Sequence, residues 1–263
     1  MKVDTPPLSA DSLARLEAIA RRAGSAILQH YQVEAPIELK LDQSPITAAD
    51  RAAHAIVCDA LARWTPAVPV ISEEGSLPPP DVRRTWSRFW LVDPLDGTKE
   101  FLQRNGEFTV NIALIDEGEP LLGVVFAPAL DLLYLAGRGL GAWKRDTGGS
   151  LERIRSRRVP AGTPLVVVES RSHPSAELEA YLQTIPVERR VAAGSSLKFC
   201  WVAEGKADIY PRFGRTMEWD VAAGDCIFRE SGEDDRPRSS PLRYNTPELA
   251  NAGFIIGAPT ENN

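Results

Sequence analysis

The sequence has few cysteines and no long apolar run. Its 263 residues include three cysteines, Cys58, Cys200 and Cys226, which lie far apart and form no Cys-x-x-Cys pair. A disulfide framework is therefore not expected, and a reducing compartment is favoured. No stretch of about 18 apolar residues predicts a membrane-spanning helix. The polar N-terminus lacks a signal-peptide core, so we expect a cytoplasmic protein. Peripheral attachment at the inner face of the cell membrane stays open.

The chain also lacks a long basic run. Its formal net charge is −6 and its pI is about 5.3, which argues against nucleic acid as a partner. An apolar fraction of 43% and a charged fraction of 25% are ordinary for a globular protein. The length suits one large domain or two tightly packed ones. An acidic protein that binds an anionic substrate must supply local positive charge, through a metal ion or a few placed Lys and Arg side chains.

Apolar residues at helical spacing predict two helices in the first part of the chain, at 10–31 and 46–64. Short apolar runs bounded by turn residues predict a series of strands in the same part, at 68–71, 89–92, 108–115, 121–127, 132–136 and 141–144. Consecutive strands joined by short turns form antiparallel pairs. This first half therefore favours an α+β arrangement.

The second part of the chain alternates strands and helices. Strands are predicted at 165–168, 207–210 and 254–256, and helices at 175–184, 195–204 and 219–230. This alternation favours a second, α/β unit. The stretch from Pro160 to Pro164 is the expected boundary, which divides the chain into 1–160 and 161–263.

One acidic segment, Asp93-Pro94-Leu95-Asp96-Gly97-Thr98, follows directly on an apolar strand. Its two carboxylates leave the strand end together. Gly97 permits a tight backbone, and Thr98 can cap a following helix whose free N–H groups face outward. The segment can thus offer carboxylates to a cation and amides to a phosphate, as metal-assisted phosphoryl chemistry requires. Taken alone, it is equally well explained as a capped turn with solvated acids.

Three further segments carry acids in similar settings. They are Ser72-Glu73-Glu74-Gly75 after an apolar strand, Thr47 to Asp50 near a helix start, and Glu218-Trp219-Asp220 at the start of an Ala/Gly-rich helix. Each alone has an ordinary structural explanation, because acids favour the first turn of a helix. Together, in this order, they match one family.

The four segments resemble the inositol monophosphatase-like superfamily of magnesium-dependent, lithium-sensitive phosphatases. The resemblance covers about residues 12–230, and Asp-Pro-Leu-Asp-Gly-Thr and Trp-Asp-x-Ala are its specific motifs. The stretches Lys99-Glu100-Phe101, Gly194 to Cys200 and Tyr210 to Gly214 are similar to the 3'(2'),5'-bisphosphate nucleotidase branch. The resemblance implies a layered αβαβα sandwich of the inositol monophosphatase and fructose-1,6-bisphosphatase type. It also implies one compact catalytic unit, with metal binding in 1–160 and substrate binding in 161–263.

The resemblance implies a role for each matching residue. The side chains of Glu73, Asp93, Asp96 and Asp220 and the carbonyl of Leu95 would hold two or three Mg²⁺ ions. Oxygen-only ligands suit magnesium, and cations would relieve the repulsion between converging carboxylates. Asp50 and Thr98 would orient and deprotonate the attacking water, with Glu73 also in the catalytic set. The substrate would contact Asp96, Gly97, Thr98, His173, Ser195, Ser196, Lys198, Arg212 and Asp220.

The implied reaction is hydrolysis of the 3'-phosphate of adenosine 3',5'-bisphosphate to AMP and phosphate, by water that two metal ions activate. Lys198 and Arg212 suit the second phosphate of such a substrate. The sulfated precursor of this nucleotide is a further candidate, and the activity would belong to sulfur metabolism. An inositol monophosphatase or broader sugar phosphatase is the alternative enzyme.

A non-catalytic metal or nucleotide sensor is the alternative of another class, although a sensor needs neither Asp50 nor Thr98. We expect a small-molecule partner and a monomer or homodimer. The polar segment 229–241 departs from the family pattern, so the edge strand of relatives is expected to be shortened or lost there.

Overall fold

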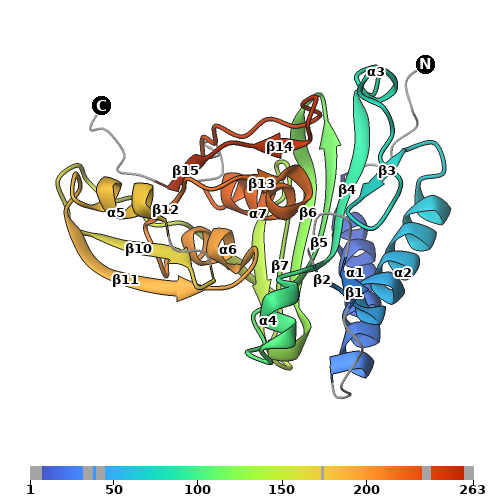
Figure 1. Cartoon of the computed structure of the whole chain (residues 1–263), viewed down its shortest axis with the longest axis horizontal. Helices are drawn as coiled ribbons and strands as arrows, with labels where there is room; N and C mark the ends of the chain where they lie inside the picture. Colours follow the sequence, from blue (N-terminus) through green and yellow to red (C-terminus); the bar gives the residue numbers. More distant parts are fainter. Residues whose placement is uncertain (1–7, 32–37, 40–44, 173–174, 233–237, 258–263) are drawn as a thin grey trace.

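The computed structural model describes residues 8–31, 38–39, 45–172, 175–232 and 238–257. Helices and sheets alternate in layers across the molecule (Figure 1). This order confirms the expected αβαβα sandwich. Within the described residues, no helix is long and apolar enough to cross a membrane.

The first two layers are a pair of helices and the larger sheet. Helices α1 (Ala10–Tyr31) and α2 (Ala48–Trp64) pack together on one face of this sheet (Figure 1). The sheet has seven strands in sequence order, and only β3 and β4 are parallel neighbours. Its strands are β3 (Val70–Ser72), β4 (Arg88–Asp96), β5 (Thr109–Asp116), β6 (Glu119–Ala127), β7 (Leu132–Gly137), β8 (Gly141–Arg145) and β9 (Glu152–Ile154).

Both faces of the larger sheet are buried. Along β4, Trp90 and Val92 pack toward α1 and α2, whereas Phe89 and Leu91 pack toward the opposite layer. Side chains alternate between the two faces of a strand, so a strand covered on both sides is apolar throughout. The burial explains why β4 to β6 read as continuous apolar runs.

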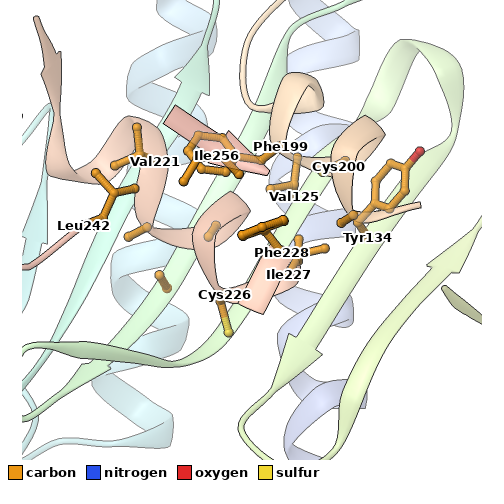
Figure 2. Packing of buried hydrophobic residues seen from close by; sticks show 14 of the residues in the cluster. Val125, Tyr134, Phe199, Cys200, Val221, Cys226, Ile227, Phe228, Leu242 and Ile256 are labelled. Atoms are coloured by element: carbon orange, nitrogen blue, oxygen red, sulfur yellow. The ribbon is translucent and has the colours of Figure 1, made fainter. Parts of the chain in front are cut away.

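The middle layer consists of α6 (Leu197–Ala203) and α7 (Glu218–Glu230). Figure 2 shows Phe199 of α6 and Phe228 of α7 packed with Val125 of β6 and Ile256 of the second sheet. The second sheet has the order β11-β10-β12-β15, and α5 (Ala176–Leu182) covers its outer face. Its strands are β10 (Leu165–Ser170), β11 (Val187–Ala193), β12 (Ile209–Arg212) and β15 (Phe254–Gly257).

Short elements complete the described structure. Helix α4 (Thr98–Leu102) follows β4 directly. The others are α3 (Pro80–Arg83), a 3₁₀ turn η1 (Pro128–Leu130), and the strand pairs β1 (Glu38–Leu39) with β2 (Pro45–Ile46) and β13 (Thr216–Met217) with β14 (Ala250–Asn251). Between the end of α7 and β14, the part of the chain that the structure describes contains no strand.

The predicted starts of α2 at 46 and of α6 at 195 were each two residues early, and the predicted cap of α4 was wrong. Helix α2 begins at Ala48 because Thr47 caps it: Thr47 accepts from the Ala49 N–H, and the Asp50 carboxylate accepts from the Thr47 N–H. Thr98 is not a cap. Gly97 occupies that position with φ of +86°, a left-handed conformation that favours glycine, and Thr98 is the first residue of α4.

Candidate active site

A cavity of about 340 Å³ lies between the end of β4, the start of α4 and the middle and second-sheet layers. Its size is within the usual range of small-molecule sites. It brings together most of the residues that the sequence singled out, namely Glu73, Asp93, Leu95, Asp96, Gly97, Thr98, Ser195, Ser196, Lys198, Arg212 and Asp220. Sequence reasoning assigned no role to the other lining residues, which are Lys99, Glu100, Ser170, Phe199, Tyr210, Arg215, Thr216 and Val221.

One side of the cavity is formed by Glu73, Asp93, Asp96 and Asp220, here called the acidic wall. Asp93 pairs with Asn111 of β5, and Asp96 pairs with Thr109, so β4 has one extra residue between these pairs. Residues three apart on a regular strand point to opposite faces. The irregularity turns Asp96 to the same side as Asp93, because their partners are two residues apart.

The acids of this wall resist ionisation. Burial, together with the charges of Glu73, Asp96 and Asp220, raises the pKa of Asp93 well above its usual value. Burial raises the pKa of Asp96 to about 6, although Lys198 and a hydrogen bond from Asn111 oppose the shift. Burial and the charge of Asp96 likewise raise the pKa of Asp220. The carboxylates therefore repel one another when no cation is present.

This donor set fits Mg²⁺. Its acidic groups offer carboxylate oxygens, and hard cations prefer oxygen ligands. Across the described residues, no three Asp, Glu, Cys or His side chains are close enough to form a ready ligand shell.

Three basic residues, Lys198, Arg212 and Arg215, line the same cavity and are here called the basic wall. The Lys198 Nζ donates to the carbonyl of Ser195 at 2.5 Å and to that of Ala193 at 3.4 Å. Burial lowers the pKa of Lys198 to about 8, and the charge of Asp96 opposes that shift, so the side chain stays mostly charged at neutral pH.

Two lining residues, Arg212 of the basic wall and Thr216, carry buried polar atoms that a bound ligand would satisfy. Within the described structure, the buried Nε of Arg212 and the buried Oγ1 of Thr216 have no hydrogen-bond partner. An unsatisfied buried donor costs about 1–3 kcal/mol. An anion in the cavity would offer such donors an acceptor.

The turn before α6 joins the two walls. The Ser195 hydroxyl donates to the Asp96 carbonyl at 2.8 Å, and the Ser196 hydroxyl donates to the Asp220 carbonyl at 2.5 Å. A Cβ atom at Gly97 would lie 2.2 Å from the Ser195 Oγ, so this approach requires glycine. Both hydroxyls thus hold the backbone of the acidic wall.

The model of the inositol monophosphatase family matches residues 10–244. This chain belongs to that family. Two curated relatives are named 3'(2'),5'-bisphosphate nucleotidase CysQ. The Escherichia coli K12 protein is 51% identical over 90% of this chain and 96% of its own length, and the Salmonella typhimurium protein is 52% identical over the same shares.

Solved structures agree with this assignment. CysQ from Bacteroides thetaiotaomicron, described as a bacterial member of the inositol monophosphatase family, superposes with a TM-score of 0.81. It is 40% identical to this chain and covers 97% of it and 100% of that structure. The chain is therefore a phosphatase of the inositol monophosphatase family, whose members generally depend on Mg²⁺.

The structure does not place two of the predicted site residues in the cavity: Asp50 lies elsewhere, and His173 is not among the described residues. Asp50 is not among its lining residues; its Oδ2 accepts from the Thr47 N–H at 2.7 Å and the Thr47 hydroxyl at 2.6 Å. Burial raises the pKa of Asp50, and the charge of Glu73 adds to the shift. The predicted pairing of Asp50 with Thr98 stays a prediction. His173 lies outside the described residues.

Proposed function

We propose that this chain is a Mg²⁺-dependent 3'(2'),5'-bisphosphate nucleotidase. It removes the 3'-phosphate of adenosine 3',5'-bisphosphate and releases AMP and phosphate. The observation that carries this proposal is that an acidic wall and a basic wall line one cavity. A substrate with one reacting phosphate and one spectator phosphate suits both walls. The activity named for the two relatives supports the same substrate.

In this proposal the acidic wall and the Leu95 carbonyl hold two or three Mg²⁺ ions. Bound Mg²⁺ supplies Lewis acidity at the phosphoryl group and offsets the repulsion between the carboxylates. The amides at Gly97 and Thr98, at the start of α4, would hold oxygens of the reacting phosphate. Asp96 and Asp220 line the same cavity from neighbouring layers of the fold.

The attacking water would be oriented by Thr98 and Asp50, with Glu73 beside them. Thr98 lines the cavity, and Asp50 is buried in the first turn of α2. In this proposal the proton of the attacking water would pass through the Thr98 hydroxyl to the Asp50 carboxylate. A general base within hydrogen-bond reach of the water is the geometric requirement for this role.

The basic wall would bind the 5'-phosphate. Arg212 offers a planar, charged donor with an unpartnered Nε, and Lys198 offers a point charge. His173 and the turn formed by Ser195 and Ser196 would contact the rest of the nucleotide. A monophosphate substrate such as inositol 1-phosphate would leave this wall without a partner.

Phosphate release from a panel of substrates tests the proposal. The panel contains adenosine 3',5'-bisphosphate, its sulfated precursor, inositol 1-phosphate and fructose 1,6-bisphosphate, each with and without Mg²⁺. We expect Mg²⁺-dependent release that is fastest with the adenosine nucleotides. Preference for inositol 1-phosphate or the sugar bisphosphate would favour the alternative phosphatases. Nucleotide binding without any turnover would favour the sensor.

We also propose that the protein acts in the cytoplasm as a monomer or homodimer. The free thiols of Cys58, Cys200 and Cys226 support a reducing compartment. Analytical ultracentrifugation of the purified chain at micromolar concentration measures its mass, and a tetramer or larger assembly would contradict the oligomeric part of this proposal.

A further inference from the structure

Asn111 lies on β5 beside the acidic wall, and its side chain is fully buried. Its Nδ2 donates to the Asp96 Oδ2 at 3.1 Å and to the Ser196 Oγ at 3.0 Å. Its Oδ1 accepts from the Thr109 hydroxyl at 2.9 Å. An amide nitrogen carries two hydrogens, so these contacts use both donors of the side chain.

The chemistry of the neighbours fixes which way the Asn111 amide points. An ionised Asp96 carboxylate can only accept a hydrogen bond. The Ser196 hydroxyl donates its single hydrogen to the Asp220 carbonyl, so it too must accept from Asn111. Both neighbours accept hydrogen bonds, so the Asn111 Nδ2 must face them. The hydrogen-bond network therefore determines the orientation of the amide.

This network joins parts of the acidic wall that belong to different layers. Asp96 ends β4 of the larger sheet, whereas Asp220 lies in the first turn of α7 in the middle layer. Asn111 holds the carboxylate of Asp96, and Ser196 holds the backbone of Asp220. The Asp220 Oδ2 also accepts from the Met217 N–H at 2.8 Å, so the side chain is oriented as well.

We propose that Asn111 is a positioning residue that, together with Ser196, fixes Asp96 and Asp220 relative to each other for cation binding. This inference rests on the proposed role of the acidic wall. A neutral amide suits the position, because it donates to a carboxylate without adding a positive charge that would compete with Mg²⁺. Residues that hold metal ligands typically contribute a factor of about 10–100 to metal affinity.

A substrate-free Mg²⁺ titration of the melting temperature tests the inference. The measured quantity is the Mg²⁺ concentration that gives half of the maximal rise in Tm. Asn111→Leu keeps the approximate side-chain volume and removes every hydrogen bond. We expect it to raise this concentration about 10-fold or more. A shift of less than about twofold, with a lower metal-free Tm, would reduce Asn111 to a structural residue and overturn the inference.

Ile112→Ala is the matched control. Ile112 is the next residue of β5 and is fully buried on the opposite face, among side chains of α1 and α2. Its truncation should lower the metal-free Tm while leaving the half-maximal Mg²⁺ concentration unchanged. An equal Mg²⁺ shift in Ile112→Ala and Asn111→Leu would show that any loss of β5 packing weakens the site, which would also contradict the inference.

Ser196→Ala removes a single oxygen and serves as the second variant, should Asn111→Leu not fold. We expect a rise in the half-maximal Mg²⁺ concentration of at least about threefold, and no rise would overturn the inference. In the double variant, the second substitution should add little, because both residues act as one unit. Fully multiplicative effects would contradict a shared role.

The titration contains no substrate, so it separates this inference from the proposed function. Preference of the wild-type enzyme for inositol 1-phosphate would overturn the proposed substrate and leave the Asn111 result standing. The opposite outcome is a wild-type preference for the adenosine bisphosphate with an unchanged half-maximal Mg²⁺ concentration in Asn111→Leu. It would support the proposed substrate and overturn the inference about Asn111.

Discussion

The two walls of the cavity are built in different ways. The acidic wall is held by internal hydrogen bonds: Asn111 binds Asp96, the Leu95 N–H binds Asp93, and the Met217 N–H binds Asp220. The basic wall keeps a buried donor, the Arg212 Nε, without a partner in the described structure. The acidic wall is held in place, but its carboxylates repel one another. The basic wall has a hydrogen-bond donor that lacks an acceptor.

This difference assigns a separate kind of ligand to each wall. Fixed carboxylates with raised pKa values need cations to become stable in their ionised form. Unpaired donors need an anion. Substitutions in the acidic wall should therefore affect turnover and Mg²⁺ binding, and substitutions in the basic wall should affect substrate choice.

The largest expected effect follows from Asp93→Asn. The substitution removes one negative charge from the centre of the acidic wall and leaves the side-chain size almost unchanged. Metal ions contribute several kcal/mol to such reactions, so kcat should fall about 10³-fold or more. Asp116→Asn is the matched control, since Asp116 pairs with Arg88 at the far end of β5. Turnover near the wild-type rate in Asp93→Asn would refute the role of the acidic wall.

Arg212→Ala should weaken substrate binding rather than slow turnover. Charge-assisted hydrogen bonds are worth about 1.5–3 kcal/mol, so KM for adenosine 3',5'-bisphosphate should rise about 10–100-fold. KM for adenosine 3'-monophosphate should change little. Arg190→Ala is the control, because Arg190 is exposed on β11 and pairs with Glu169 and Glu179. Equal effects on both substrates would remove Arg212 from the second-phosphate site.

Lys198→Ala should have a smaller effect of the same kind, about 10-fold in KM for the bisphosphate. The Lys198 ammonium already donates to the carbonyls of Ser195 and Ala193, so less of its hydrogen-bonding capacity is left for substrate. Lys206→Ala, which removes a lysine stacked on Trp201, is the control. An equal rise in KM for adenosine 3'-monophosphate would indicate that Lys198 shapes the turn only.

The smallest effect concerns stability and pH. The folded-state pKa values of Asp93, Asp96 and Asp220 are raised, to about 6 for Asp96, so the metal-free folded protein holds extra protons at mildly acidic pH. The contribution of Asp96 to stability is therefore present below pH about 4 and is lost as the pH rises through about 6. The contributions of Asp93 and Asp220 are likewise lost as the pH rises through their own raised pKa values. Mg²⁺ competes with these protons and should raise Tm by about 5 °C at pH 7.5 and by less at pH 5. Calorimetry with Mg²⁺ or EDTA measures this, and an equal gain at both pH values would contradict it.

Much of the fold followed from local patterns. The apolar alternation from 108 to 144 placed β5 to β8 correctly, and the helical spacing at 10–31 matched α1. Strand β11 was missed because Glu188, Arg189 and Arg190 give it a polar, exposed surface at the sheet edge. The division into 1–160 and 161–263 stays a prediction, although the larger sheet ends before this boundary and the second begins after it.

The site was predictable only in part. The family resemblance identified the acidic wall, and the comparisons confirm both the family and the phosphatase activity. The roles of the individual residues stay predictions. Asn111, Glu100 and Thr216 were assigned no role, because a stretch that matches a family does not show which of its side chains reach the site. The strand irregularity that brings Asp93 and Asp96 to one face depends on pairing with β5, which spacing alone does not reveal.

One measurement tests the central claim that the two walls serve one substrate. It is the ratio of kcat/KM for adenosine 3',5'-bisphosphate to that for adenosine 3'-monophosphate, measured for the wild-type enzyme at saturating Mg²⁺. The two molecules differ only in the phosphate that the basic wall would bind. We predict a ratio of about 10² or more, as expected for a buried charge-assisted contact. A ratio near one would mean that the basic wall does not recognise a second phosphate, and the account would be wrong.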